Sequence, residues 1–296
     1  MMKEKYIRYI ARAIVSVILL VILDYVLARK STSFYTLISL LSQNGYSLTQ
    51  GEIRSLEMLY GYNSNLFYSV SNYLISFFTG NWGYSIFYGR PVISLVLGAL
   101  IRSLILIAGS LGISIPLILL ITYLSIKYLG SFQDNFLNTI LIILYSIPEV
   151  VIATLLFILL PPNIISPMLT LAVIELTFLY MFVRRNLTQL LVEHYNMIEF
   201  FVSLGLDGRI ISKEILRLTV PLLLVAITYS ISTSIPALIF VETVFNYPGI
   251  GYMMVQAINN SDYPLASGCF ILFSIISIIL NLIADVTNSK VDWRVK

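Results

Sequence analysis

Residues 104–126 read LILIAGSLGISIPLILLITYLSI, a run of 23 residues without a single charged side chain. An α-helix rises about 1.5 Å per residue, so about 20 apolar residues cross the hydrocarbon core of a bilayer. This stretch therefore predicts a membrane-spanning helix, and five others resemble it in length and composition. The six expected spans are residues 9–27, 104–126, 136–160, 164–183, 218–241 and 265–286.

The composition of the whole chain agrees with a membrane protein. Of its 296 residues, 58% are hydrophobic and only 11% are charged, and the mean hydropathy is +0.90. Soluble domains carry about 25% charged residues. We find no internal repeat and no linker. The expected fold is therefore an all-α membrane protein with six transmembrane helices in one membrane domain, residues 1–296.

The positions of Lys and Arg predict the orientation of the chain. If the N-terminus is cytoplasmic, 13 of the 18 basic residues fall in inside segments. The other five lie in or beside one long outside loop, and long loops largely escape the positive-inside rule. We therefore expect both termini inside. The 13 inside residues are Lys3, Lys5, Arg8, Arg12, Lys127, Arg184, Arg185, Arg209, Lys213, Arg217, Lys290, Arg294 and Lys296.

In this orientation the long loop, residues 28–100, is extracytoplasmic. Its mixture of Tyr, Phe, Leu, Gly and Asn is typical of an ordered segment. Residues 47–60 show helical spacing of apolar side chains and predict a short amphipathic helix. Residues 77–91 contain three glycines, a tryptophan and a proline, so we expect them to turn at the membrane interface.

Two carboxyl groups lie deep inside expected spans, Glu149 in the third and Glu175 in the fourth. An unpaired carboxylate there costs about 2.5–3.5 kcal/mol on insertion scales. One interpretation makes them pathway residues that face the transported solute, for example the amine of a peptide. The other makes them hydrogen-bonded packing residues. Four prolines also interrupt the spans: Pro116, Pro148, Pro221 and Pro236.

Enzyme and cofactor chemistry finds little support in this sequence. There is no phosphate-binding G-x-x-x-x-G-K-[ST] motif, no H-E-x-x-H and no G-x-S-x-G. The single histidine, His194, and the single cysteine, Cys269, do not form an ordinary zinc or haem site. We therefore expect no catalysis, no cofactor and no metal, and the small net charge of +3 gives no reason to expect nucleic acid.

The segment between the fourth and fifth spans, residues 184–217, is called the elbow below. Residues 193–204 can form a helix with apolar residues on one face, which Gly205 would end. Asp207 and Gly208 predict a turn, and helical spacing resumes from Ile210. The apolar face predicts either a docking surface for another protein or a helix that lies on the bilayer.

A second patterned segment follows the fifth span. Residues 248–251 read PGIG and cannot continue a helix. The segment would form a re-entrant or interfacial hairpin at the extracytoplasmic mouth of a pathway, or simply a tight loop.

Both segments resemble the permease subunits of ABC importers. The elbow is similar to their coupling loop, which places an acidic start, a glycine and a later proline between two spans, although Phe201 and Ser203 stand where that family usually has alanines. Several further segments resemble the oligopeptide/dipeptide branch, in the same order along the chain. They are GNWGYS at 80–85, GRPV at 89–92, SIP at 146–148, VETVFNYPGIG at 241–251, DYP at 262–264 and VDWR at 291–294.

The resemblance implies a set of partners. A second, similar permease subunit would pair with this chain, two ATP-binding cassette ATPases would bind the elbows, and a solute-binding protein would deliver solute outside. The implied coupling residues are Glu199, Phe200, Gly205, Leu206, Arg209 and Ile210. The implied residues of the outer mouth are Pro248, Gly249, Gly251, Asp262 and Tyr263.

The implied solute is a peptide, with an oligosaccharide as the second choice, and nickel is carried by similar permeases. A self-sufficient secondary transporter is the alternative class, and it would need Glu149 and Glu175 as an ion or proton site.

Overall fold

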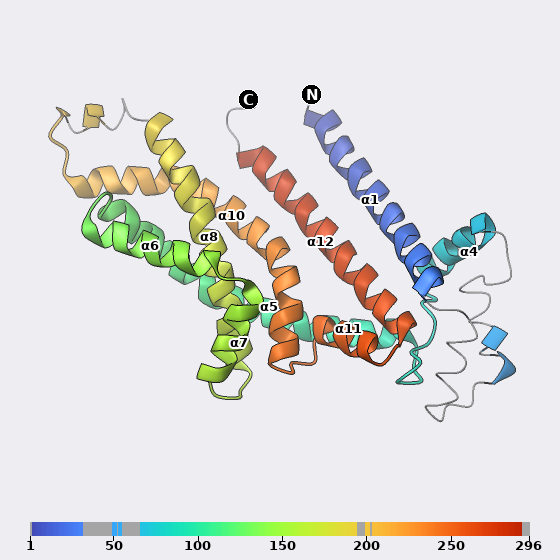
Figure 1. The fold of residues 1–296 in the computed structure, drawn as a ribbon. Helices are drawn as coiled ribbons and strands as arrows, with labels where there is room; N and C mark the ends of the chain where they lie inside the picture. Colours follow the sequence, from blue (N-terminus) through green and yellow to red (C-terminus); the bar gives the residue numbers. More distant parts are fainter. Residues whose placement is uncertain are drawn as a thin grey trace. The chain divides into compact units, whose positions relative to one another are not determined.

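The computed structural model describes residues 2–31, 49–51, 53, 54, 66–193, 199–201 and 203–291. These residues are mainly helical, and the described residues contain one isolated bridge, between Tyr84 and Pro91. In chain order (Figure 1), the helices are α1 (Met2–Ser31), α4 (Leu66–Phe78), α5 (Val92–Lys127), α6 (Phe132–Ser146), α7 (Glu149–Leu159), α8 (Ile165–Glu193), α10 (Gly208–Val244), α11 (Ile250–Asn259) and α12 (Tyr263–Val291).

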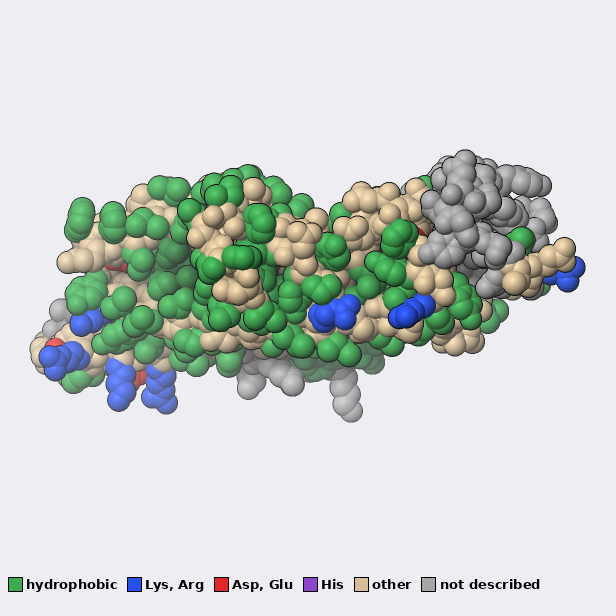
Figure 2. Space-filling model, turned by 90° about the horizontal axis from the view of Figure 1, so that it is seen from below, with side chains coloured by type: hydrophobic (Ala, Val, Ile, Leu, Met, Phe, Trp, Pro, Cys, Tyr) green, Lys and Arg blue, Asp and Glu red, His purple; other side chains and the backbone are tan. Residues whose placement is uncertain are grey.

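Five described helices are long and apolar enough to cross a membrane: α1, α5, α8, α10 and α12. The pair α6 and α7 makes a sixth span if the two helices are counted together. Hydrophobic side chains cover most of the face drawn in Figure 2, and Lys and Arg side chains appear there only in small groups. The prediction of an all-α membrane protein is therefore confirmed, with five or six spans.

The third expected span, residues 136–160, is broken. The chain bends by 103° between α6 and α7. Figure 1 shows the two helices running in different directions. Pro148 has no N–H to donate, and Ile147 is extended, so α6 ends where the Ile147 N–H reaches the Leu144 carbonyl at 3.2 Å. Pro148 was expected to interrupt this span, and the structure confirms the interruption; the size of the bend was not predicted.

All five long described helices exceed their expected spans in length, and α5 and α10 do so by the most. Helix α5 has 36 residues and α10 has 37, so each is about 54 Å long, whereas the hydrocarbon core is about 30 Å thick. The expected spans of these two helices began just after Arg102 and Arg217, because a charged side chain avoids lipid. Helical hydrogen bonding continues past these residues, since a charge outside the lipid does not interrupt a helix.

The chain divides into two compact units. The first contains residues 1–103 and 248–279, and it buries a cluster formed by Val21 and Tyr25 of α1, Tyr73 of α4, and Ile86 and Ile271. The Tyr25 and Tyr73 rings pack 5.1 Å apart. This cluster joins the first helix to residues that lie far along the chain.

The second unit contains residues 104–247 and 280–296. Its central helices are α8 and α10, whose most apolar windows are 56% and 50% buried, against 28% for α5. At the start of α6, Asp134 is buried and forms a two-pronged ion pair with Arg184 of α8, with N–O distances of 2.8 and 2.9 Å. This pair fixes α6 against α8.

Some predictions lie partly or wholly outside the described residues. Within 47–60, residues 50, 51, 53 and 54 are helical, residue 49 is described but not helical, and the remainder lies outside the described residues. His194 and residues 292–294 of the terminal VDWR motif also lie outside. The turn expected at 77–91 is present, and Gly80, Gly83 and Gly89 have positive φ angles there.

Gly268 of α12 provides a test of packing in the first unit. A Cβ atom at this position would lie 2.4 Å from Cγ1 of Val92, a stiff β-branched side chain on α5. Gly268→Ala should therefore overpack the contact and destabilise the fold by about 1–3 kcal/mol. Gly112→Ala is the matched control, because no atom lies within 4 Å of its Cβ position. Thermal unfolding in detergent measures both, and equal melting temperatures for the two variants would contradict this packing.

Candidate functional site

The elbow turns where predicted. Residues 199–201 and 203 are helical, and Gly205 adopts a left-handed φ of +70°. The Leu206 N–H donates to the Phe201 carbonyl at 3.3 Å, which is the hydrogen bond of a Schellman cap. Asp207 caps the start of α10 by accepting from the Arg209 N–H. The expected Asp207–Gly208 turn is therefore a helix cap.

The elbow exposes apolar side chains on one side and buries them on the other. Phe200 and Leu204 are each 58% exposed and Ile210 is 48% exposed. Ile211 and Ile215, in contrast, pack on a small core cluster with helices α5 and α8. Phe200, Leu204 and Ile210 therefore remain largely exposed within the described part of the elbow.

The segment after α10 is held by the start of α5. Pro248 accepts a hydrogen bond from the Arg102 guanidinium, and the Ile250 N–H donates to the Ser103 hydroxyl at 2.8 Å. Helix α11, which follows, has ten residues and is too short to span a bilayer. The PGIG segment is therefore an anchored turn that leads into a short helix.

Asp262 connects two segments that were predicted separately. Its carboxyl group is fully buried and accepts hydrogen bonds from the Ser85 hydroxyl and from the N–H groups of Ile86 and Phe87, the latter two at 3.1 Å. It also accepts from the Leu265 N–H at 3.3 Å and so caps α12. This arrangement, the Asp262 clamp, joins the DYP segment to the turn at 77–91.

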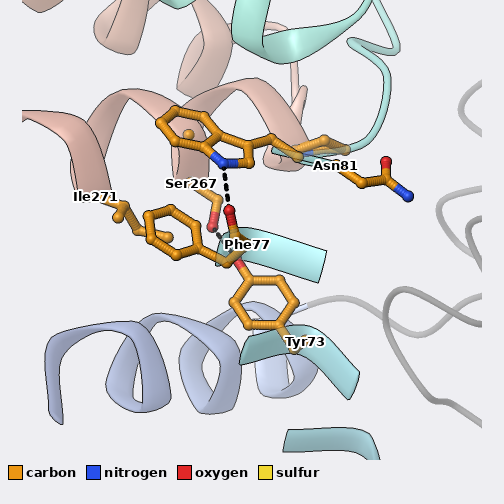
Figure 3. A pocket seen from close by; sticks show the side chains of 8 residues that line it. Tyr73, Phe77, Asn81, Ser267 and Ile271 are labelled. Carbon is orange, nitrogen blue, oxygen red and sulfur yellow. Dashed lines mark hydrogen bonds between the residues drawn. The ribbon is translucent and has the colours of Figure 1, made fainter. Parts of the chain in front are cut away.

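A small cavity lies beside the Asp262 clamp (Figure 3). Figure 3 shows Tyr73, Phe77, Asn81, Ser267 and Ile271 around it. Its volume of about 10 Å³ holds one water molecule at most. The Trp82 indole N–H donates to the Phe77 carbonyl at 3.1 Å. The cavity is therefore a packing feature and not a solute site.

The hydroxyl of Tyr73 beside that cavity donates to Asp24 of α1 at 2.8 Å, and Ser267 of α12 donates to the same oxygen. Burial, together with the neighbouring Asp24 carboxyl group, raises the pKa of Tyr73 above its usual range, so the phenol keeps its proton. The three side chains join α1, α4 and α12.

A larger cavity in the second unit contains both predicted intramembrane acids. Its volume is about 260 Å³. The lining residues are Leu144, Tyr145, Ile147, Glu149, Ile152, Ile174, Glu175, Thr177, Phe178, Thr233 and Ser234. The break between α6 and α7 forms part of its wall, and α8 and α10 supply the rest. We call it the acidic cavity.

Glu175 is 1% exposed and is surrounded by hydroxyl groups. Ser110 and Ser114 of α5 donate to its two oxygens at 2.9 Å each, and Ser234 of α10 donates at 3.1 Å. Hydrogen bonds to a buried carboxyl group offset much of its cost of leaving water. The packing interpretation of Glu175 therefore has direct support, and its position on the acidic cavity leaves the pathway interpretation open.

Comparison with known proteins defines the family. The family described as "Binding-protein-dependent transport system inner membrane component" matches residues 114–296, more than half of the chain. The chain belongs to this family. It is therefore a multi-pass membrane protein and a permease component of a transport system, as the resemblance predicted.

Curated relatives of this permease share about a quarter of its residues. The probable peptide ABC transporter permease protein y4tP of Sinorhizobium fredii is 26% identical over 85% of this chain and 87% of its own length. The metal-staphylopine import system permease protein CntB of Staphylococcus aureus is 24% identical over 80% of each chain. The dipeptide transport system permease protein DppB of Lactococcus lactis is 25% identical over 84% of this chain and 87% of its own length.

The structure brings some predicted residues of the permease together and leaves others apart. Glu149 and Glu175 share one cavity. Asp262 binds the 77–91 turn, and Tyr263 packs on the core cluster of the first unit. Pro248 is hydrogen-bonded to Arg102, and Gly251 is buried in α11. Their roles at an outer mouth, and those of the elbow residues in coupling, stay predictions.

Sequence reasoning missed the partners of these residues. Ser110 and Ser114 lie four positions apart in an apolar run, so they share one helix face, and this spacing was an available signal. The sequence holds no such signal for Ser85, for Ser103 or for the ion pair between Asp134 and Arg184. Their roles depend on contacts between residues far apart in the sequence.

The Asp262 clamp generates a prediction for this permease. In Asp262→Asn, one carboxyl oxygen becomes an NH₂ group, so two of the four buried donors lose their acceptor. This should destabilise the protein by about 2 kcal/mol and raise protease cleavage within residues 79–91. Asp207→Asn, at an exposed helix cap where Asn serves equally well, should change stability by less than about 0.5 kcal/mol. Unchanged cleavage in Asp262→Asn would contradict the clamp.

Proposed function

We propose that this chain is a permease subunit of an ATP-driven ABC importer that carries peptides or a chemically similar small solute. It would pair with a second homologous permease subunit, with two ATP-binding cassette ATPase subunits and with an extracytoplasmic solute-binding protein. The chain would form one transmembrane domain, residues 1–296, with both termini in the cytoplasm. Residues 28–100 would lie outside and the elbow, residues 184–217, inside.

The observation that carries this proposal is the elbow. It lies within the part of the chain that matches the family, and within its described residues Phe200, Leu204 and Ile210 are largely exposed. Exposed apolar side chains on a rigid, capped turn favour a protein partner. Glu199, Leu206 and Arg209 would surround this apolar contact, and Gly205 would set its angle.

The second part of the proposal concerns the outer mouth. Pro248, Gly249 and Gly251 precede and enter α11, and Asp262 and Tyr263 follow it. The Asp262 clamp ties this segment to the turn at 77–91 in the long extracytoplasmic loop. Solute delivered by the binding protein would enter the membrane here.

Peptide is the favoured solute, because two relatives that match more than four fifths of this chain are named for peptides or dipeptides. Oligosaccharide is the second choice. Another relative is named for a metal chelate, and a shorter match, which covers 43% of this chain, is named for nickel import. Uptake by the reconstituted importer from a mixture of labelled tripeptides, oligosaccharides and nickel would identify the class.

The permease itself would hydrolyse no ATP and bind no cofactor, and the energy would come from the partner ATPases. A self-sufficient secondary transporter makes the opposite prediction. Proteoliposomes that contain this chain alone, without ATP and under an ion gradient, should show no uptake. Uptake under those conditions would overturn the proposal.

The elbow yields a test of coupling. Phe200→Ala and Leu204→Ala should each weaken ATPase binding and reduce ATP-dependent uptake by about tenfold, since central apolar contacts at interfaces contribute about 1–2 kcal/mol or more. Leu159→Ala is the matched control, because Leu159 is 75% exposed on α7, away from the elbow in the sequence. Co-purification of the ATPases with each variant, and uptake, are measured together. Full ATPase binding by both elbow variants would contradict the coupling role.

A further inference from the structure

The acidic cavity has an uneven distribution of charge. Its eleven lining residues include Glu149 and Glu175 and no Lys, Arg or His. The other polar lining groups are the hydroxyls of Thr177, Thr233 and Ser234, apart from the phenol of Tyr145. Nothing in the lining neutralises two carboxyl groups, so the cavity favours a cation.

The broken span contributes a second feature that favours a cation. Leu144, Tyr145 and Ile147 lie at the C-terminal end of α6 and line the cavity. The last carbonyl groups of a helix carry a partial negative charge, and the end of an interrupted membrane helix is a known kind of cation site. The start of α7 has the opposite polarity, but Glu149 is its first residue and places a carboxyl group there.

The two carboxyl groups differ in what they already bind. Glu175 is buried and accepts three serine hydrogen bonds, so its position is fixed. Glu149 is half-buried, and within the part of the chain that the structure describes no hydrogen bond or ion pair reaches it. Glu149 is therefore free to bind a ligand, while Glu175 holds a second carboxyl group in a fixed position.

We propose that the acidic cavity binds the ammonium group of the transported solute, with Glu149 as the direct ligand. This inference rests on the proposed function and deepens it. The volume of about 260 Å³ is just below the range of about 300–1,000 Å³ for pockets that enclose a drug-sized ligand, so the cavity takes one end of a solute. The rings of Tyr145 and Phe178 also line it, and aromatic faces attract ammonium groups.

A bare transition-metal ion is less suited to this lining. Such ions prefer imidazole and thiolate ligands, and the lining contains no His or Cys. An ammonium group needs only oxygen acceptors and an aromatic face, and the cavity provides both.

The test is protection of Glu149 from chemical modification. The purified importer, with its partner subunits, is treated with dicyclohexylcarbodiimide, which modifies carboxyl groups in apolar surroundings, and the modified residues are quantified by mass spectrometry. Trialanine at millimolar concentration should lower the labelling of Glu149 at least fivefold. N-acetyl-trialanine, which lacks the ammonium group, should not. Labelling of Asp285, a half-buried carboxyl group on α12 that does not line the cavity, is the control and should not respond to either peptide.

Equal protection by both peptides, or by neither, would overturn the ammonium site. Protection by Ni²⁺ or Mg²⁺ without protection by trialanine would overturn it in favour of a metal ion. If Glu149 does not react at all, uptake decides: Glu149→Gln should lower the ratio of trialanine to N-acetyl-trialanine uptake at least fivefold, and Asp285→Asn should not. An unchanged ratio in Glu149→Gln overturns the inference, whereas failure of the wild-type importer to carry any peptide overturns the proposed solute class.

Discussion

The hydrocarbon interior of a membrane offers no hydrogen-bond partner, and this constraint governs where the polar side chains of the chain lie. Asp24 is satisfied by Tyr73 and Ser267, and this set joins three helices of the first unit, α1, α4 and α12. Glu175 is satisfied by serines of α5 and α10, and this set joins α5, α8 and α10 of the second unit. The polar residues inside the spans therefore specify which helices pack together.

The same constraint explains how the chain interrupts its helices. Gly205, Asn246 and Ser261 all adopt positive φ angles just after a helical segment. In each case the next residue donates its N–H to a carbonyl in the last turn, so the irregular backbone stays hydrogen-bonded. The Asp262 clamp does the same for the turn at 77–91. The breaks at Gly205, Asn246 and Ser261 thus keep their backbone groups hydrogen-bonded, and the break at Pro148 borders the acidic cavity.

The sequence was sufficient for features that depend on local composition. Runs without charge predicted the spans, and Gly205 predicted the end of the elbow helix. Pro148 was recognised as an interruption, but its 103° bend was not, because a proline can either kink a membrane helix or divide it. The clamp between Asp262 and Ser85 depends on residues 177 positions apart, and nothing local to either reveals the other. For the same reason the sequence identified Glu149 and Glu175 as candidates but could not show that they line the same cavity.

The orientation of the chain is the claim on which both the coupling elbow and the outer mouth depend. Its most direct test is labelling of single cysteines with a membrane-impermeant maleimide. Ser203→Cys reports on the elbow and Asn259→Cys on the end of α11, and both native residues are exposed, whereas the native Cys269 is buried. We predict that Asn259→Cys reacts in intact cells and that Ser203→Cys reacts only in inverted membrane vesicles. Reaction of Ser203→Cys from outside the cell would contradict the account.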